Sequence, residues 1–298
     1  MRNKLDLDLG KTTADIIDLI KTKCIEMDRN GAVLGFSGGL DSALTAALLC
    51  KALKKENIYL LYMPERDSKK IHQKHAKLLA EEIGCKYIEE SITGGLRSLG
   101  VYGVLPLGFV PFQWMRSALV KFGKKYLMDD REKGELISRM NYEPESWVAR
   151  GNAYAMAKHR LRVVVIYKFA EIHNLMVVGA VNRTEWLTGT FSKWGIDHCA
   201  DIMPILHLYR TQVERIADYT GVPELIREKP ADPDILPGLD MKNELLGDFK
   251  LVDNVLFDMQ DGMSRKIMIE RYPQNLVDKL WELNKLSRHM RESPYSLE

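Results

Sequence analysis

The sequence predicts an α/β fold in which a parallel, twisted sheet carries helices on both faces. Short apolar strands alternate with segments of helical periodicity, which is the pattern of strand–helix–strand units. The strand candidates are apolar almost throughout, as in strands that are covered on both sides. The 298 residues are 46% hydrophobic and 28% charged, an ordinary globular composition. A chain of this length can bury about three quarters of its unfolded surface, so a large core is feasible.

The alternation is regular in the first third of the chain. Asp67 or Ser68 is suited to cap the third helix, and Gly84 is suited to end it. The elements predicted here are a helix at 13–28, a strand at 32–36, a helix at 42–54, a strand at 58–63, the capped helix, and a strand at 85–88.

The alternation resumes after a break. It gives a helix at 153–172, a strand at 175–178 that ends at Gly179, and a helix at 211–220 that Gly221 stops. From Asn243 onward the chain has the pattern of successive helices. We therefore expect one domain over 1–298, with a helical C-terminal part and an insert at about 93–150.

The insert begins with glycines and prolines and holds a possible amphipathic helix. Long inserts are often lids or binding loops, so the segment is expected to cover the acceptor site. An insert that only adds stability or dimer surface is an equal alternative, and a membrane-surface helix is a weaker one. The aromatic residues that suit a lid contact are Phe109, Phe112 and Trp114, and the apolar face of the helix holds Met115, Ala118, Leu119, Phe122 and Tyr126.

Composition and spacing exclude several classes of protein. The net charge of +2 calls for neither nucleic acid nor an anionic membrane as a partner. The four cysteines form no CxxC pair, which disfavours a zinc site or a disulfide framework and favours a reduced, cytoplasmic protein. The longest apolar stretch, 102–112, is too short to span a bilayer. The charged N-terminus lacks the apolar segment of a signal peptide.

The sharpest motif is Ser37-Gly38-Gly39-Leu40-Asp41-Ser42, which follows a predicted strand and opens a predicted helix. Glycines let the backbone turn sharply near a ligand, and a helix N-terminus directs free N–H groups into the turn. The loop is therefore suited to a pyrophosphate. Asp41 would repel phosphates unless a metal lies between them, which favours Mg²⁺. The motif lacks the Gly-Lys-Ser/Thr of a Walker A loop.

This hexapeptide resembles the pyrophosphate loop of the N-type ATP pyrophosphatases, which have the adenine-nucleotide alpha-hydrolase-like fold. Later segments resemble, in order, consecutive blocks of the ammonia-dependent NAD synthetase family. The resemblance covers roughly 13–92 and 151–295. The blocks lie at 179–185 (GAVNRTE), 189–195 (GTFSKWG), 201–205 (DIMPI), 208–213 (LYRTQV), 221–223, 228–230, 244–247 and 288–294.

The resemblance implies an enzyme that joins a carboxylate to AMP with loss of pyrophosphate and then transfers ammonia to it. Asp41 and Glu185 would hold Mg²⁺, with Asp41, Glu185 and Arg210 as the catalytic set. The acceptor implied is nicotinic acid adenine dinucleotide, with free ammonia or ammonia from another protein, in a homodimer. The residues implied to contact ATP or the acceptor are Ser37, Gly38, Gly39, Ser42, Arg160, Arg162, Lys193, Asp197 and Arg210.

The acceptor end departs from the family pattern. The loop Gly195-Ile196-Asp197-His198-Cys199 has one extra residue and lacks two small glycines, and the Gly151–Arg162 spacing is stretched. Near the ATP, Ala180 and Ala231 replace hydroxyl residues. Two alternatives therefore stay open: the same chemistry on another acid or in a thiolation, and a non-catalytic nucleotide-binding protein. Retention of two metal carboxylates disfavours the second alternative.

Two histidine patterns invite other interpretations. His198 beside Cys199 resembles a nucleophile pair, but sequence neighbours rarely meet in the required geometry, so we expect a loop that shapes the acceptor pocket. His72 and His75 lie one turn apart without further metal ligands, and we expect both on the surface.

Overall fold

A four-stranded parallel sheet lies at the centre of the computed structural model, which describes residues 5–105, 110, 112, 114–119, 135–228 and 246–292. The strands are β1 (Gly31–Gly35), β2 (Ile58–Tyr62), β3 (Lys86–Glu89) and β4 (Leu175–Val178), in the order β3-β2-β1-β4. Each agrees with its predicted strand to within about one residue at either end. β2 and β3 follow β1 on one side of it, and β4 then pairs with the other side of β1. The loops after β1 and β4 therefore diverge at a topological switch point, where open α/β sheets bind ligands.

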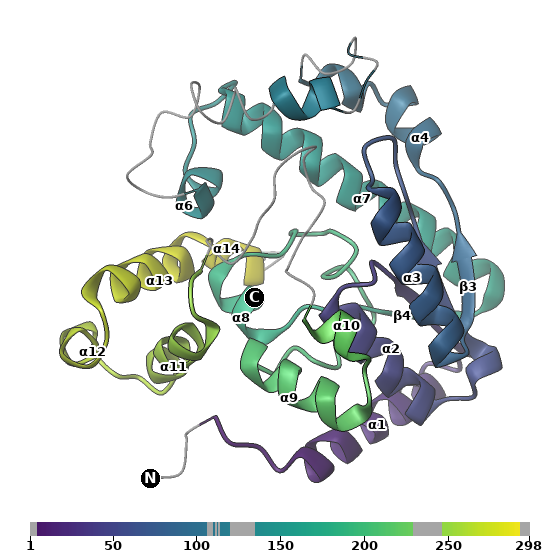
Figure 1. The fold of residues 1–298 in the computed structure, drawn as a ribbon, viewed down its shortest axis with the longest axis horizontal. Helices are drawn as coiled ribbons and strands as arrows, with labels where there is room; N and C mark the ends of the chain where they lie inside the picture. The colour runs from purple at the N-terminus through teal and green to yellow at the C-terminus, as the bar shows by residue number, and fades with distance from the viewer. Residues whose placement is uncertain are drawn as a thin grey trace, which may run out of the picture.

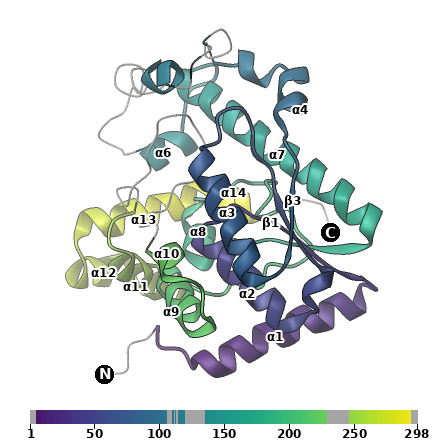
Figure 2. The ribbon, with the colours of Figure 1, turned by 45° about the vertical axis from the view of Figure 1, so that its right-hand side comes forward.

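Helices cover both faces of the sheet, as the sequence predicts (Figures 1 and 2). On β1, Leu34 points into one core cluster and Val33 into the other, because successive side chains of a strand face opposite ways. The first cluster is closed by α1 (Leu9–Glu26), α2 (Leu40–Ala52), α3 (Lys70–Ile83), α9 (Arg210–Thr220) and α10 (Glu224–Arg227). The second is closed by α4 (Thr93–Ser98), the 3-10 turn η2 (Val101–Gly103) and α7 (Trp147–His173), and the turn η1 (Lys55–Asn57) precedes β2.

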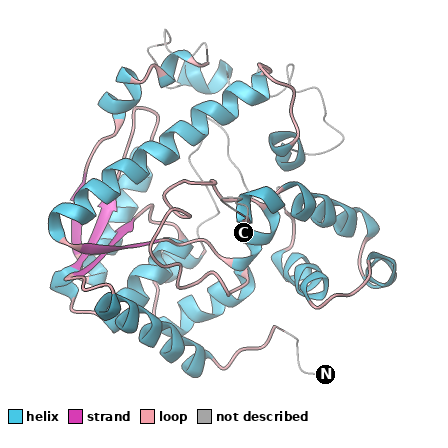
Figure 3. Cartoon of the chain, turned by 180° about the vertical axis from the view of Figure 1, so that it is seen from behind, coloured by secondary structure: helices cyan, strands magenta, loops and turns pink. Residues whose placement is uncertain are grey.

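A third cluster, built from helices, lies beside the sheet domain. Figure 3 shows this group from behind, on the opposite side of the molecule from the magenta strands. The predicted helical C-terminal part is confirmed by α11 (Phe249–Gln260), α12 (Arg265–Arg271), α13 (Gln274–Leu286) and α14 (Arg288–Arg291). The cluster also takes in α8 (Arg183–Thr188) and α6 (Glu135–Met140), which comes from the predicted insert.

Several helix starts differ from the prediction. The helix predicted at 153–172 begins six residues earlier, at Trp147, because the Ser146 side chain accepts a hydrogen bond from the Ala149 backbone N–H at 3.1 Å. The first helix begins at Leu9 because the Asp8 side chain accepts a hydrogen bond from the Lys11 backbone N–H at 2.9 Å. The cap predicted at Asp67 or Ser68 is wrong: α3 begins after Lys69, which makes no side-chain cap bond. Asp67 is instead buried in an ion cluster. Gly84 ends the helix as predicted, in the left-handed conformation that favours glycine.

The predicted surface position of His72 is also wrong, because its side chain is buried, with 8% of it exposed. It lies on the same helix face as Ala76 and Leu79, which pack into the first core cluster.

The first part of the insert is integrated into the core. Leu96, Val101 and Leu105 are buried in the second cluster. Buried Arg116 places its Nε 2.8 Å from Asp67 Oδ1, in the loop that follows β2. Residues 114–119 are helical, whereas Phe109, Phe122 and Tyr126 lie outside the described residues. In the part of the chain that is described, no helix is long and apolar enough to cross a bilayer.

Candidate functional site

The Ser37–Ser42 loop follows β1 at the carboxyl end of the sheet and leads into α2. Gly38 has φ of 70°, and a Cβ on it would lie 3.2 Å from the backbone of Ala76, so glycine is required twice over. The Ser37 hydroxyl accepts from the Gly39 N–H at 3.2 Å, and the Ser42 hydroxyl donates to the Gly39 carbonyl at 3.0 Å. The two hydroxyls thus fix the conformation of the loop at the start of α2. The backbone N–H groups of the first turn have no partner within the helix.

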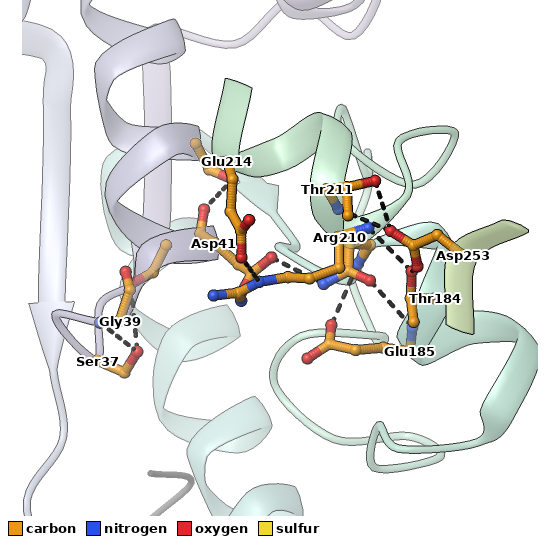
Figure 4. A network of polar contacts seen from close by, with 12 residues as sticks. Ser37, Gly39, Asp41, Thr184, Glu185, Arg210, Thr211, Glu214 and Asp253 are labelled. Atoms are coloured by element: carbon orange, nitrogen blue, oxygen red, sulfur yellow. Dashed lines mark hydrogen bonds and ion pairs between the residues drawn. The ribbon is translucent and has the colours of Figure 1, made fainter. Parts of the chain in front are cut away.

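Asp41 lies in the first turn of α2 and faces two other elements (Figure 4). Its Oδ1 accepts a hydrogen bond from Asn182 Nδ2 at 2.8 Å. Its Oδ2 lies 3.1 Å from the Arg210 guanidinium, and Arg210 also reaches Glu214 Oε1 at 3.1 Å. Asn182 caps α8, which follows β4, and Arg210 begins α9. The loops on both sides of the switch point therefore meet at one carboxylate.

Glu185 stands beside this carboxylate in the first turn of α8. A capping box fixes it: the Asn182 side chain accepts from the Glu185 N–H at 3.0 Å, and Glu185 Oε2 accepts from the Asn182 N–H at 3.2 Å. Burial and then the negative charge of Asp41 raise the pKa of Glu185 well above its ordinary value. Asp197 adds to that repulsion, while the Asn182 N–H and the charge of Arg210 oppose it.

Asp197 is affected by the same neighbouring charges. Burial raises the pKa of Asp197 to about 6, the charge of Asp41 adds to the rise, and Arg162 opposes it. The charge of Asp41 thus raises the energy of the ionised forms of Glu185 and Asp197, which is the environment that a divalent cation relieves. Among the described residues, no group of three or more His, Cys, Asp or Glu side chains is arranged to hold a metal by itself. The carboxylates therefore fit a Mg²⁺ that takes further oxygens from phosphates or water, as Mg²⁺ ordinarily does.

The basic residues implied by the family resemblance take different positions. Arg210 points into the site, as described above. Arg162 donates from Nε to the Met63 carbonyl at 3.1 Å and acts electrostatically on Asp197. Arg160, two residues earlier on α7, has an exposed side chain. Lys193 donates to the backbone carbonyl of His289 at 2.8 Å and so joins the α8–α9 connection to α14.

The altered loop 195–199 packs directly on the ends of β1 and β4. A Cβ on Gly35 would lie 2.6 Å from the Ile196 side chain, and a Cβ on Gly179 would lie 2.3 Å from the Asp197 carbonyl. The missing side chains of these two glycines leave the space in which the loop lies. Ile196 is buried in the second core cluster, so its side chain anchors the loop to the sheet.

His198 and Cys199 have no features of a nucleophile pair. The His198 ring lies among Trp186, Phe191 and Trp194, with centroid distances of 5.5, 5.1 and 5.2 Å, and its Nδ1 accepts from the Trp194 N–H. Burial and Asp201 raise the pKa of the Cys199 thiol, which disfavours the thiolate. The role of the loop in shaping the acceptor pocket stays a prediction.

The structure adds site residues that the sequence reasoning missed. Asn182 precedes Glu185 by three positions, and that spacing is a readable capping signal. Thr184 and Asp253 belong to the same network, but Asp253 comes from α11, far along the chain. Its position gives no local signal, because the contact depends on how the helical part packs beside the sheet.

Comparison with known proteins decides the family. The family model described as NAD synthase matches residues 12–101 and 119–294. The chain belongs to the NAD synthase family. The unmatched residues 102–118 lie within the insert and include Arg116.

Relatives match over nearly the whole chain. An NH3-dependent NAD⁺ synthetase of Thermotoga maritima is 36% identical over 95% of this chain and 98% of its own length. One of Methanocaldococcus jannaschii is 31% identical over 96% of this chain and 97% of its own.

Solved structures support the fold. A structure described as NMN synthetase from Francisella tularensis has a TM-score of 0.69 at 22% identity and covers 98% of this chain and 99% of its own. An NH3-dependent NAD synthetase from Campylobacter jejuni, in complex with nitrate, has a TM-score of 0.67 at 23% identity, with 98% and 100% covered. These two solved structures therefore share the predicted α/β architecture of this chain.

Proposed function

We propose that this chain is an ammonia-dependent ligase that joins the carboxylate of nicotinic acid adenine dinucleotide to AMP and transfers ammonia to it. The products are NAD, AMP and pyrophosphate. The observation that carries the proposal is the meeting of Asp41, Glu185 and Arg210 beside the Ser37–Ser42 loop at the switch point of the sheet. Such a site binds a polyphosphate and a cation together.

The residues of the site divide the work between binding and charge neutralisation. The backbone of Gly38 and Gly39 at the start of α2 would hold phosphate oxygens, and Arg210 would stabilise the charge that develops as pyrophosphate leaves. Asp41 and Glu185 would hold Mg²⁺, which neutralises phosphate charge and acts as a Lewis acid when it is bound. The protein contributes mainly orientation and a preorganised field to the attack of the carboxylate and then of ammonia.

The direct test supplies the purified chain with ATP, Mg²⁺ and ammonium, with or without nicotinic acid adenine dinucleotide, and measures pyrophosphate and NAD. Formation of both products only with the dinucleotide supports the proposal. Pyrophosphate that forms instead with nicotinic acid mononucleotide or another acid would reassign the acceptor, which is the alternative that the altered 195–199 loop motivates. ATP binding without any turnover would indicate a non-catalytic protein.

Ammonia is expected to be the nitrogen source. The rate of NAD formation at subsaturating total ammonium should rise by about tenfold per pH unit below the pKa of ammonium, because NH₃ and not NH₄⁺ is the nucleophile. Rates at a fixed concentration of free NH₃ over the same pH range are the control and should vary much less. Efficient use of glutamine by the purified chain alone would contradict this prediction.

The insert is proposed to cover the acceptor. Because residues up to 105 and buried Arg116 are part of the core, the test changes Phe109, Phe112 and Trp114 to alanine and replaces residues 120–134 with a Gly/Ser linker. The KM of the acceptor should rise at least about tenfold, while ATP binding stays nearly unchanged. The family resemblance also supports a homodimer, so sedimentation of the wild type and the variant is the control. An unaltered acceptor KM in a folded variant rules out the lid, and a change in assembly alone assigns the insert to dimer surface.

A further inference from the structure

Asp253 on α11 is a fully buried carboxylate in the hydrogen-bond network behind Glu185 and Arg210. None of its surface is exposed. Its Oδ1 accepts a hydrogen bond from the Thr184 hydroxyl at 2.6 Å. Its Oδ2 accepts from the Thr211 backbone N–H at 2.8 Å and from the Thr211 hydroxyl at 2.7 Å. Burial raises the pKa of Asp253, while the bonds from Thr184 and Thr211 lower it, so these donors are what favours the charged form.

The threonines belong to the first turns of the two helices that carry the site. Thr184 directly precedes Glu185 on α8, and Thr211 directly follows Arg210 on α9. The Thr184 hydroxyl also accepts from the Arg210 backbone N–H at 2.9 Å. One carboxylate, acting through one hydroxyl, therefore joins the start of α8 to the start of α9 (Figure 4).

This arrangement specifies the direction of each hydrogen bond. Thr184 has one hydroxyl proton, and it donates that proton to Asp253 while it accepts from Arg210. An asparagine at position 253 would have one oxygen that accepts hydrogen bonds, and its NH₂ group would only donate them. Facing its oxygen to the two donors of Thr211 would turn its NH₂ toward Thr184 and reverse that bond.

We infer that Asp253 is a positioning residue for the reaction: it fixes α8 and α9 relative to each other, so that Glu185 and Arg210 converge on Asp41. The inference rests on the proposed function of that site. Packing of α11 does not require the charge, because Val252, Val255 and Leu256 already bury its apolar face. The carboxylate is the group on this helix that hydrogen-bonds both α8 and α9.

The chain offers a matched control on the same helix. Asp258 is also buried, with 2% of it exposed, and its Oδ2 accepts from the Tyr272 hydroxyl at 2.9 Å, between α11 and the residue that follows α12. Asp258→Asn therefore changes a buried carboxylate of α11 within the helical cluster, whereas Asp253→Asn changes the one that faces the site.

The experiment compares the wild type, Asp253→Asn and Asp258→Asn for kcat, the KM of ATP and acceptor, the Mg²⁺ concentration for half-maximal rate, and Tm. Asp253→Asn should lose between about 10-fold and 100-fold in kcat or in apparent Mg²⁺ affinity, with the acceptor KM within about twofold. Asp258→Asn should lower Tm to a similar extent and keep kcat within about twofold.

A second pair of variants keeps the inference testable if Asp253→Asn does not fold. Thr184→Val removes the hydroxyl with little change of shape and should reproduce the loss, and Thr184→Ser should restore most of it. Wild-type kcat and Mg²⁺ dependence in folded Asp253→Asn or Thr184→Val would overturn the inference, as would equal kinetic losses in Asp258→Asn.

ATP binding separates this inference from the proposed function. The affinity of each variant for ATP is measured by calorimetry without an acceptor, with and without Mg²⁺. Mg²⁺ should strengthen ATP binding less in Asp253→Asn than in the wild type or Asp258→Asn. A wild type that forms no NAD would defeat the proposed function, and the calorimetric comparison would still decide the role of Asp253.

Discussion

Asp41→Asn is expected to lower the rate of pyrophosphate formation by roughly 100- to 1,000-fold at saturating Mg²⁺. The carboxylate does two things that an amide of the same shape cannot do together. It accepts from Asn182 while it forms an ion pair with Arg210, and it supplies negative charge to a bound cation. Glu185→Gln should have a comparable effect, because it removes the second of the two carboxylates proposed to hold the metal.

The fold should survive both changes. Asp41 and Glu185 lie beyond the carboxyl ends of β1 and β4, outside the core clusters, so Tm is expected to shift little. Asp218→Asn on α9, which removes an exposed carboxylate paired with Arg227, is the matched control and should keep the wild-type rate. If Asp41→Asn or Glu185→Gln turns over near the wild-type rate with saturating Mg²⁺, the metal assignment is wrong.

The sequence was sufficient to predict the sheet because its strands are short, apolar and regularly spaced. Residues 32–36 and 175–178 carry almost only apolar side chains, and they prove to be neighbouring strands, β1 inside the sheet and β4 at its end. Their adjacency was not predictable from periodicity, which reports whether a segment is a strand but not which strand lies beside it. That adjacency brings the Ser37–Ser42 loop and Glu185 together, and only the family resemblance implied it.

Side chains with a long-range role were predicted least well. Aspartate is a residue type that often caps helices, but Asp67 is buried, where it pairs with Arg116 and accepts a hydrogen bond from Tyr154. These contacts outweigh the capping preference. Asp253 lies in an ordinary amphipathic pattern, and its partners are about 40 to 70 positions away. Hydrogen bonds of this kind depend on tertiary packing, which local propensity does not encode.

The acceptor loop illustrates a further limit. Comparison of residues shows that Gly195-Ile196-Asp197-His198-Cys199 is altered, but not where the additional bulk goes. In the structure the Ile196 side chain fills the space above Gly35, while Asp197 still faces Asp41 and Glu185 electrostatically. The change is therefore absorbed by packing on the sheet, and the carboxylate of the loop stays in the site.

Arg210→Met is expected to lower kcat by about 100-fold, because it removes the positive charge that faces Asp41 and the departing pyrophosphate. The guanidinium is held on two sides, 3.1 Å from Asp41 and 3.1 Å from Glu214, and only 12% of the side chain is exposed. Methionine fills a similar apolar volume, so the loss should appear in the rate and not in Tm.

Arg210→Lys separates charge from geometry. Lysine keeps the positive charge, so it should retain activity within about tenfold, although a single ammonium cannot contact Asp41 and Glu214 with the fork of the guanidinium. Steady-state rates of all three proteins at several ATP concentrations measure the difference. If Arg210→Lys is as inactive as Arg210→Met, the bidentate geometry is what matters. If Arg210→Met is as active as the wild type, Arg210 serves only to neutralise Asp41 in the absence of ligands, and its assignment to the catalytic set is wrong.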